Sequence, residues 1–220
     1  RRIMTETSGA FVQGSVNSLV IGATAGVMGL VLTGVTHPDL AQKMTLIILS
    51  YSYGFIFLAV VLVAFASYIL GMGMTITASY ILIIILAGPA LQELGLSMLT
   101  SHMIVLWLSQ DAALTPPFAL GAFIAAGIAQ CDPMTTGFTS LKLAKPLYVV
   151  PLLMAYTSIL MDGPWSDVIM VWVGASLGFI ASAAVLEGYF IRLLTWTDRG
   201  MLSAASLLLF WNGIWFKLAG

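Results

Sequence analysis

The chain has 220 residues, of which 60% are hydrophobic and only 8% are charged, and its mean hydropathy is +1.04. Soluble domains carry roughly 25% charged residues, so this composition excludes a soluble protein and requires lipid as the solvent. The net charge of −1 gives no sign of nucleic-acid binding. The single cysteine, Cys131, excludes a disulfide framework and a thiolate metal site.

Charged residues divide the chain into expected membrane segments, because a helix needs about 20 apolar residues to cross a hydrocarbon core about 30 Å thick. The sequence begins RRIMTETSG, without an initiating Met, and we expect it to be part of a longer membrane protein. The uncharged stretch from Thr7 to Pro38 predicts a first span at about 14–36.

A helical hairpin is predicted at about 53–95. From Met44 to Gln92 there are 49 residues without a charge, and a single helix of that length would be about 73 Å long, more than two core thicknesses. The segment must therefore turn back, and its best turn signal is GMGMT, which begins at Gly71. A re-entrant hairpin and two full spans fit the sequence equally well.

The next crossing, at about 98–130, is predicted to be a helix broken near its middle. The break falls at LTPP (114–117), where Thr115 is placed to cap a new helix that begins at Pro116. Such a start exposes backbone amides and a partial positive charge. The alternative is a proline kink, which is common in membrane helices.

Four further helices complete the expected order. The polar stretch DPMTTGFTSLKLAKP (132–146) predicts a short interfacial helix with Asp132 as its N-cap. Three simpler spans follow at about 146–161, 168–186 and 200–216, and the second contains GASLG (174–178), a spacing of small residues typical of close helix packing. The positive-inside rule is satisfied when three basic groups share the cytoplasmic side: Arg1 and Arg2, Lys142 and Lys145, and Arg192 and Arg199. Asp162 and Asp167 then lie in an outer loop.

The two interruptions are the candidate functional site, since non-helical backbone at membrane depth is tolerated only where it is buried in protein or lines a cavity. In transporters, broken helices direct free carbonyls toward a cation and helix N-termini toward an anion. At the first interruption Gly71 and Gly73 free the backbone, and hydroxyl oxygens come from Thr75, Thr77 and Ser79. The alternative is an ordinary turn whose small residues serve packing.

Asp111 stands just before the second interruption. An acidic side chain inside a membrane is costly and usually functional, and the alternative is that Asp111 sits in a wetted pocket without a direct role. There is no glycine-rich phosphate loop with a lysine and no Ser–His pair or aspartate pair at catalytic spacing. Neither His37 nor His102 has a second ligand-type residue four positions on. We therefore expect no enzyme, no bound cofactor and no transition-metal site.

At these two interruptions the chain resembles a known family. GMGMTITASYILIIILAGPALQELG, followed by LTPPFALGAFIAAGIAQCDPMTTGFTSLKLAKP, is similar to the large membrane subunit of tripartite ATP-independent periplasmic (TRAP) transporters. The branch that it most resembles is the fused permeases that work with TAXI-type binding proteins; ATAGVMGLVLTG (23–34) and LEGYF (186–190) fit that branch too. The resemblance covers nearly the whole chain.

The resemblance implies an all-α polytopic membrane protein built as the second inverted repeat of an elevator-type transporter. Residues 1–145 would form the transport-domain repeat, and residues 146–220 the terminal transmembrane helices. It also implies Na⁺-coupled uptake of organic acids delivered by a periplasmic binding protein, in a bacterial inner membrane, together with the rest of the permease: its first repeat and a small membrane subunit or fused domain. The implied Na⁺ ligands are Gly71, Gly73, Thr75, Thr77, Leu114 and Thr115. The implied substrate contacts are Ser79, Thr115, Pro116 and Pro117.

The sequence departs from the family pattern at two places. The family usually has Pro and then Thr where this chain has Thr75 and Ile76, and a small residue where it has Asp111. Two alternatives therefore stay open: a proton-coupled transporter of the same fold with Asp111 as the carrier, and a non-transporting membrane scaffold subunit.

Overall fold

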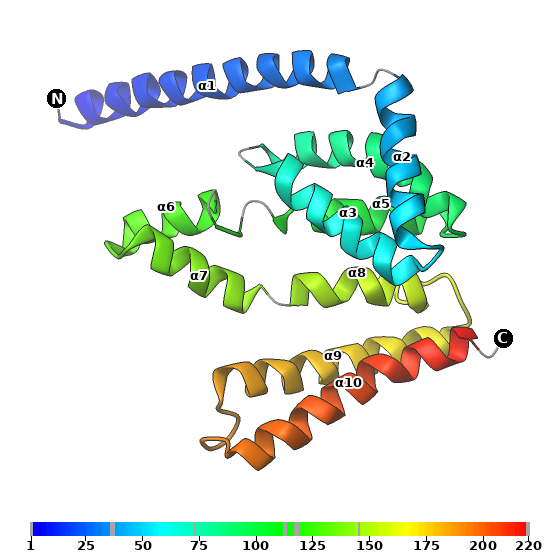
Figure 1. The fold of residues 1–220 in the computed structure, drawn as a ribbon. Coiled ribbons are helices and arrows are strands. Elements are labelled where there is room, and N and C mark those ends of the chain that lie inside the picture. The colour runs from blue at the N-terminus through cyan, green and yellow to red at the C-terminus, as the bar shows by residue number, and fades with distance from the viewer. Residues whose placement is uncertain are drawn as a thin grey trace.

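The computed structural model describes residues 2–35, 38–72, 74–111, 114–116, 119–144 and 146–218. Every regular element in these ranges is a helix (Figure 1). The helices are α1 (Arg2–Val35), α2 (Pro38–Ser52), α3 (Ile56–Gly71), α4 (Ile76–Glu93), α5 (Met98–Leu108), α6 (Leu120–Ala129), α7 (Pro133–Leu143), α8 (Pro146–Tyr156), α9 (Trp165–Glu187) and α10 (Trp196–Leu218). The all-α class expected from the composition is confirmed.

Three helical segments of the described chain are long and apolar enough to cross a membrane. They are Ile76–Glu93, Pro133–Tyr156 and Trp165–Glu187. The fold is therefore that of a multi-pass membrane protein. The first of the three predicted terminal spans differs from its expected form, because α8 has 11 residues and, at 1.5 Å per residue, is only about 16 Å long. It reaches the length of a span only together with α7.

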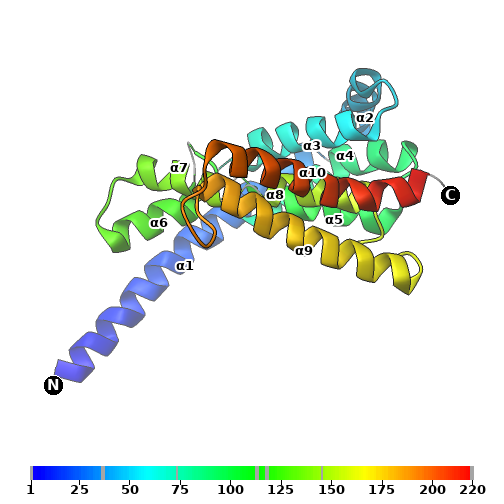
Figure 2. The same cartoon turned by 90° about the horizontal axis from the view of Figure 1, so that it is seen from below.

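Helix α1 contains the predicted first span and runs well beyond it toward the N-terminus. Its 34 residues give a length of about 51 Å, and it extends away from the other helices (Figure 2). Large apolar side chains such as Phe11, Leu19 and Leu30 are exposed along it. Such a helix is stable only where lipid or another membrane segment covers those side chains.

Helices α3 and α4 lie within the segment predicted to form a hairpin, and they pack against each other. The amide of Met74 donates to the carbonyl of Gly71 at 3.1 Å, and Thr75 is the N-cap of α4 because its hydroxyl accepts from the Ala78 amide at 3.4 Å. With 16 residues, α3 is about 24 Å long, shorter than a hydrocarbon core of about 30 Å.

Helix α2 is not predicted by the charge pattern. Asp39 and Lys43 lie between the two uncharged stretches that predict the first span and the hairpin, and both fall inside this 15-residue helix. Asp39 falls in the first turn, where a carboxylate suits the positive end of the helix dipole. The helix packs across α3 and α4 and covers one side of the hairpin (Figure 1).

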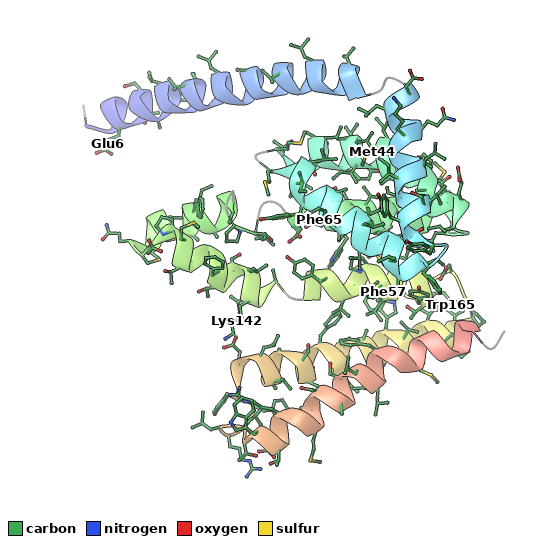
Figure 3. All side chains as sticks on the ribbon, viewed as in Figure 1. Glu6, Met44, Phe57, Phe65, Lys142 and Trp165 are labelled. Carbon is green, nitrogen blue, oxygen red and sulfur yellow. The ribbon has the colours of Figure 1, made fainter. Side chains whose placement is uncertain are left out.

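One hydrophobic core holds the hairpin, the first half of the broken helix and α8 together (Figure 3). Its buried members include Val63, Ile83, Leu91, Ile104, Val105, Val150 and Met154. Helix α8 thus packs against α3 and α5, although the sequence analysis groups it with the terminal helices. The division at residue 145 stays a prediction.

Helices α9 and α10 form a second hairpin along the edge of this core (Figures 1 and 2). The rings of Phe179 and Phe210 pack with centroids 5.0 Å apart, and the Ser206 hydroxyl donates to the carbonyl of Gly178 at 3.0 Å. The glycines of GASLG face α10: a Cβ on Gly174 would lie 3.4 Å from the Leu209 carbonyl oxygen. The close packing predicted from this pattern is present.

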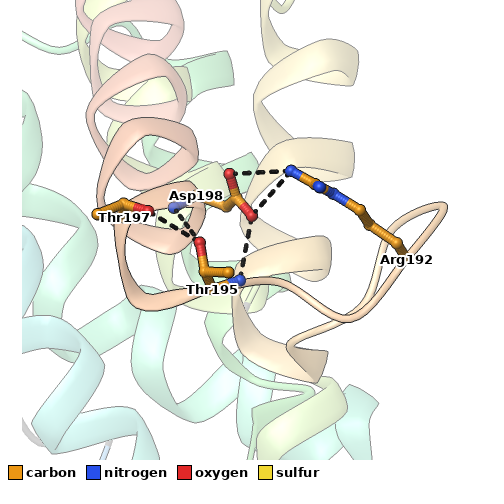
Figure 4. Close-up of polar contacts among 4 residues, drawn as sticks. All are labelled: Arg192, Thr195, Thr197 and Asp198. Atoms are coloured by element: carbon orange, nitrogen blue, oxygen red, sulfur yellow. Dashed lines mark hydrogen bonds and ion pairs between the residues drawn. The ribbon is translucent and has the colours of Figure 1, made fainter.

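Charged residues gather where α9 turns into α10. Arg192 pairs with Asp198 at 3.3 Å, and the same carboxylate accepts from the Thr195 amide at 3.1 Å (Figure 4). Lys142, at the end of α7, pairs with Glu187 at 3.0 Å. Lys142 and Arg192, from two of the predicted basic groups, therefore lie at the same end of α9. Asp167 lies in the first turn, at the other end of this helix. The 23 residues of α9 separate the two ends by about 34 Å, as the charge pattern requires.

The short helix predicted at 132–146 is present as α7, and Asp132 caps it as expected. Its location at the membrane interface stays a prediction. The Asp132 carboxylate accepts from the Thr135 amide at 2.7 Å. This hydrogen bond lowers the pKa of Asp132 from its ordinary value, so the cap is complete at neutral pH and is lost only as the pH falls through that lowered pKa.

Candidate functional site

The helix predicted to break at LTPP does break, and the interruption is wider than predicted. Helix α5 ends at Leu108 and α6 begins at Leu120, so residues 109–119 separate the two halves. The expectation that Thr115 caps a helix starting at Pro116 is wrong. The N-cap position of α6 is Ala119, which makes no side-chain capping bond.

Thr115 instead uses its hydroxyl to bind Asp111. Its Oγ1 donates to Asp111 Oδ1 at 2.6 Å, and its amide donates to the Asp111 carbonyl at 3.0 Å. The Thr115 hydroxyl is thus engaged by a residue four positions earlier in the chain, and it does not serve the capping role that the sequence suggests.

Asp111 is buried, with 4% of its surface exposed. Besides Thr115, the Tyr148 hydroxyl on α8 donates to the same Oδ1 atom at 2.7 Å, and the two hydroxyl oxygens lie 3.3 Å apart. Burying a carboxylate is expensive unless hydrogen bonds or opposite charges compensate it. Two hydroxyl donors therefore converge on one buried carboxylate oxygen, and a direct role of Asp111 stays a prediction.

Two further contacts fix the segment just after Thr115. The Tyr68 hydroxyl on α3 donates to the carbonyl of Pro116. On α7, Gly137 lies directly behind the same proline: a Cβ added there would be 3.0 Å from Pro116 Cγ. Tyr68 comes three residues before Gly71, so this contact joins the turn end of the hairpin to the break.

Because Gly137 touches Pro116, replacing it by alanine is expected to disturb the break and slow transport. Alanine raises helix propensity by about 1 kcal/mol, but the new methyl group would lie closer to Pro116 Cγ than an ordinary contact allows and would strain the packing by about 1–3 kcal/mol. The matched control is Gly127→Ala on α6, where a Cβ meets nothing within 4 Å. Initial uptake rates of the complete transporter should fall for Gly137→Ala only. Equal rates for both variants would contradict a tightly fixed break.

At the turn of the hairpin the predicted ligands differ in their surroundings. Gly71 is buried and its carbonyl already accepts from Met74, whereas Thr75 and Thr77 are exposed. Ser79 is 1% exposed, and its hydroxyl has no hydrogen-bond partner in the described part of the chain. Gly73 and, at the break, Pro117 lie outside the described residues.

Ser67 on α3 shares this property with Ser79. It is 0% exposed, and its Oγ has no partner among the described residues. Other helical serines of the chain behave differently: the hydroxyls of Ser101 and Ser109 donate to the carbonyl four residues back. Ser67 lies on α3 and Ser79 on α4, the two packed helices of the hairpin. Two buried hydroxyls of these helices are therefore available to a ligand.

The family of the chain follows from a comparison with known families. The family model of the DctM component of tripartite ATP-independent periplasmic transporters matches residues 3–160, which is more than half of the chain. The chain belongs to this family. No curated protein and no solved structure matches it. The predicted resemblance to the large TRAP subunit is thereby confirmed, and the chain is a membrane permease component of such a transporter.

The sequence analysis does not predict three side chains of the candidate site, namely Tyr68, Tyr148 and Ser67. Tyr68 and Tyr148 bind residues that are 48 and 37 positions away in the chain. No local sequence pattern predicts a contact over such a separation. A weak signal exists, because a tyrosine inside an apolar membrane helix needs a partner for its hydroxyl. In the described part of the DctM chain, no three His, Cys, Asp or Glu side chains gather as they would around a transition metal.

Proposed function

We propose that the chain is the permease part of a Na⁺-coupled secondary transporter that takes up organic acids delivered by a periplasmic binding protein. Membership of the DctM family establishes the transporter permease. The observation that carries the finer proposal is the pair of buried residues Asp111 and Thr115 at the break, which Tyr148 contacts from α8 and which Tyr68 connects to the hairpin.

The cation would bind between the hairpin turn and the break. Broken membrane helices offer carbonyl oxygens to Na⁺, and the proposed carbonyls are those near Gly71, Gly73 and Leu114. Hydroxyl oxygens of Thr75, Thr77 and Thr115 complete the proposed set. Both hydrogens of the Thr115 and Tyr148 hydroxyls point to Asp111. The lone pairs of Thr115 Oγ1 are thereby left for a cation, and the nearby carboxylate adds negative charge.

The organic anion would bind on the other side of the same two interruptions. Helices α4 and α6 begin there, at Ile76 and Leu120, and helix N-termini attract carboxylates. The buried Ser79 hydroxyl, which has no partner in the described part of the chain, supplies a donor beside them. Thr115, Pro116 and Pro117 are the other proposed contacts of the substrate.

The proposed setting is the inner membrane of a bacterium. A tripartite transporter implies other components, and we propose that these are a periplasmic substrate-binding protein, a small membrane subunit or fused domain, and the first repeat of the permease. The hairpin and the broken helix would carry substrate and ion across the bilayer together, in an elevator movement. No nucleic-acid partner and no cofactor other than the coupling ion is proposed.

A proton-coupled transporter is the second candidate, because Asp111 is a carboxylate buried at membrane depth and such groups mark proton pathways as well as cation sites. One experiment separates the candidates. The complete permease is reconstituted with its binding protein in proteoliposomes, and organic-acid uptake is measured with a Na⁺ gradient at equal pH and with a pH gradient without Na⁺. Uptake with the Na⁺ gradient alone is the expected result. Uptake that follows pH and ignores Na⁺ would favour the proton carrier, and no uptake in either gradient would indicate a scaffold.

A further inference from the structure

Two tyrosine hydroxyls reach the break from opposite neighbours. Tyr68 comes from α3 of the hairpin and binds the carbonyl of Pro116, while Tyr148 comes from α8 and binds Asp111. Thr115, the one side chain proposed above for both ion and substrate, lies between these two anchor points and directly before Pro116. In the described part of the break, the backbone amides of Leu114 and Thr115 both donate to the carbonyl of Asp111. The side-chain contacts of Tyr68 and Tyr148 hold the segment further, at Pro116 and Asp111.

The hydrogen-bond directions at Asp111 explain what Tyr148 does. Thr115 Oγ1 and Tyr148 Oη both donate to Asp111 Oδ1, at 2.6 and 2.7 Å. Each hydroxyl has one hydrogen, so the 3.3 Å approach between the two oxygens leaves the Thr115 oxygen as an acceptor only. A cation ligand needs this arrangement, with the hydrogen turned away and the lone pairs free. Tyr148 binds Asp111 Oδ1, the same atom that accepts the Thr115 hydrogen. It thereby keeps this oxygen directed at Thr115.

We infer that Tyr68 and Tyr148 are positioning residues that set the affinity of the break for its coupling cation, without binding that cation themselves. The inference rests on the proposed Na⁺ coupling. Tyr148 acts through Asp111 on the side chain of Thr115, and Tyr68 acts on the backbone at Pro116. Preorganised ligands lower the cost of binding because less freedom is lost when the ion arrives. Loss of either hydroxyl should therefore weaken ion binding rather than the movement of the loaded carrier.

The test uses Tyr148→Phe and Tyr68→Phe, which remove one oxygen atom each and keep the ring. In proteoliposomes with the complete permease and its binding protein, initial uptake is measured against Na⁺ concentration at saturating substrate. The half-saturating Na⁺ concentration should rise about tenfold for Tyr148→Phe, which loses a bond to a charged group, and about threefold for Tyr68→Phe. The maximal rate should change little. The matched control is Tyr51→Phe, whose side chain is exposed on α2.

A double-mutant cycle asks whether Tyr148 works through Asp111. Asp111→Asn alone should raise the half-saturating Na⁺ concentration, and adding Tyr148→Phe should raise it no further, because contacting residues that act as a unit are not additive. Fully additive effects would overturn the inferred route through Asp111.

The outcomes separate this inference from the proposed function. If wild-type uptake depends on Na⁺ but both tyrosine variants match Tyr51→Phe in half-saturating Na⁺, the inference is overturned and the function stands. A fall in maximal rate alone would also overturn it, since that is the sign of a purely structural role. If wild-type uptake ignores Na⁺, the proposed function fails, and the inference fails with it.

Discussion

Thr115→Val should reduce Na⁺-driven uptake at least about thirtyfold. The substitution keeps the branched shape and removes the hydroxyl, so Asp111 loses one of its two side-chain donors and the cation loses a proposed ligand. Losing a hydrogen bond to a buried charge costs about 1.5–3 kcal/mol, and each 1.4 kcal/mol is a factor of ten. The measurement is the initial rate of organic-acid uptake by the complete permease with its binding protein.

The control for this variant is Thr139→Val on α7. Thr139 is exposed, and its hydroxyl bonds only the carbonyl of Thr135, at 2.9 Å. Its uptake should equal that of the wild type. Thr77→Val, at the hairpin turn, should also lower the rate if the two interruptions share one ion. Wild-type rates for both Thr77→Val and Thr115→Val would show that the paired site is wrong.

A second large effect is expected at Gly178, where α9 and α10 touch. A Cβ at this position would lie 2.7 Å from Phe210 Cε1 and 3.0 Å from its Cζ. The ring of Phe210 has Phe179 as a neighbour, so Gly178→Leu should force the helices apart and stretch the bond from Ser206. We expect a loss of about 1–3 kcal/mol of stability, measured as a lower unfolding temperature of the purified permease in detergent.

Two variants make the Gly178 result specific. Gly174→Ala should leave the unfolding temperature close to that of the wild type, because its nearest neighbour would be at the ordinary distance of 3.4 Å. In a Phe210→Ala background, Gly178→Leu should cost less than in the wild type, since the clashing ring is gone. Equal costs in the two backgrounds would show that the contact between Gly178 and Phe210 does not hold the pair together.

The positions of the hairpin and of the broken helix follow from the sequence because they depend on length and charge. An uncharged run of 49 residues has to turn somewhere, and glycine or proline marks the place where turning costs least. The same reasoning does not predict α2, because Asp39 and Lys43 lie between the two uncharged stretches and yet both belong to this helix. Charge marks where a chain meets water, and a helix does not have to end there.

The internal contacts of the site could not be predicted in the same way. Local rules make Thr115 an excellent helix cap, and only the folded chain shows that a buried carboxylate four residues earlier competes for its hydroxyl. The partners of the break come from α3, α7 and α8, through Tyr68, Gly137 and Tyr148. Such contacts depend on how the helices pack, and periodicity or composition carries no information about them.

The most direct test of the account is equilibrium binding of radioactive Na⁺ to the purified complete permease. The wild type and Thr139→Val should bind Na⁺ saturably, and Thr115→Val should lose that binding. Equal binding by the wild type and Thr115→Val, or no saturable binding by the wild type, would contradict a cation site at the break.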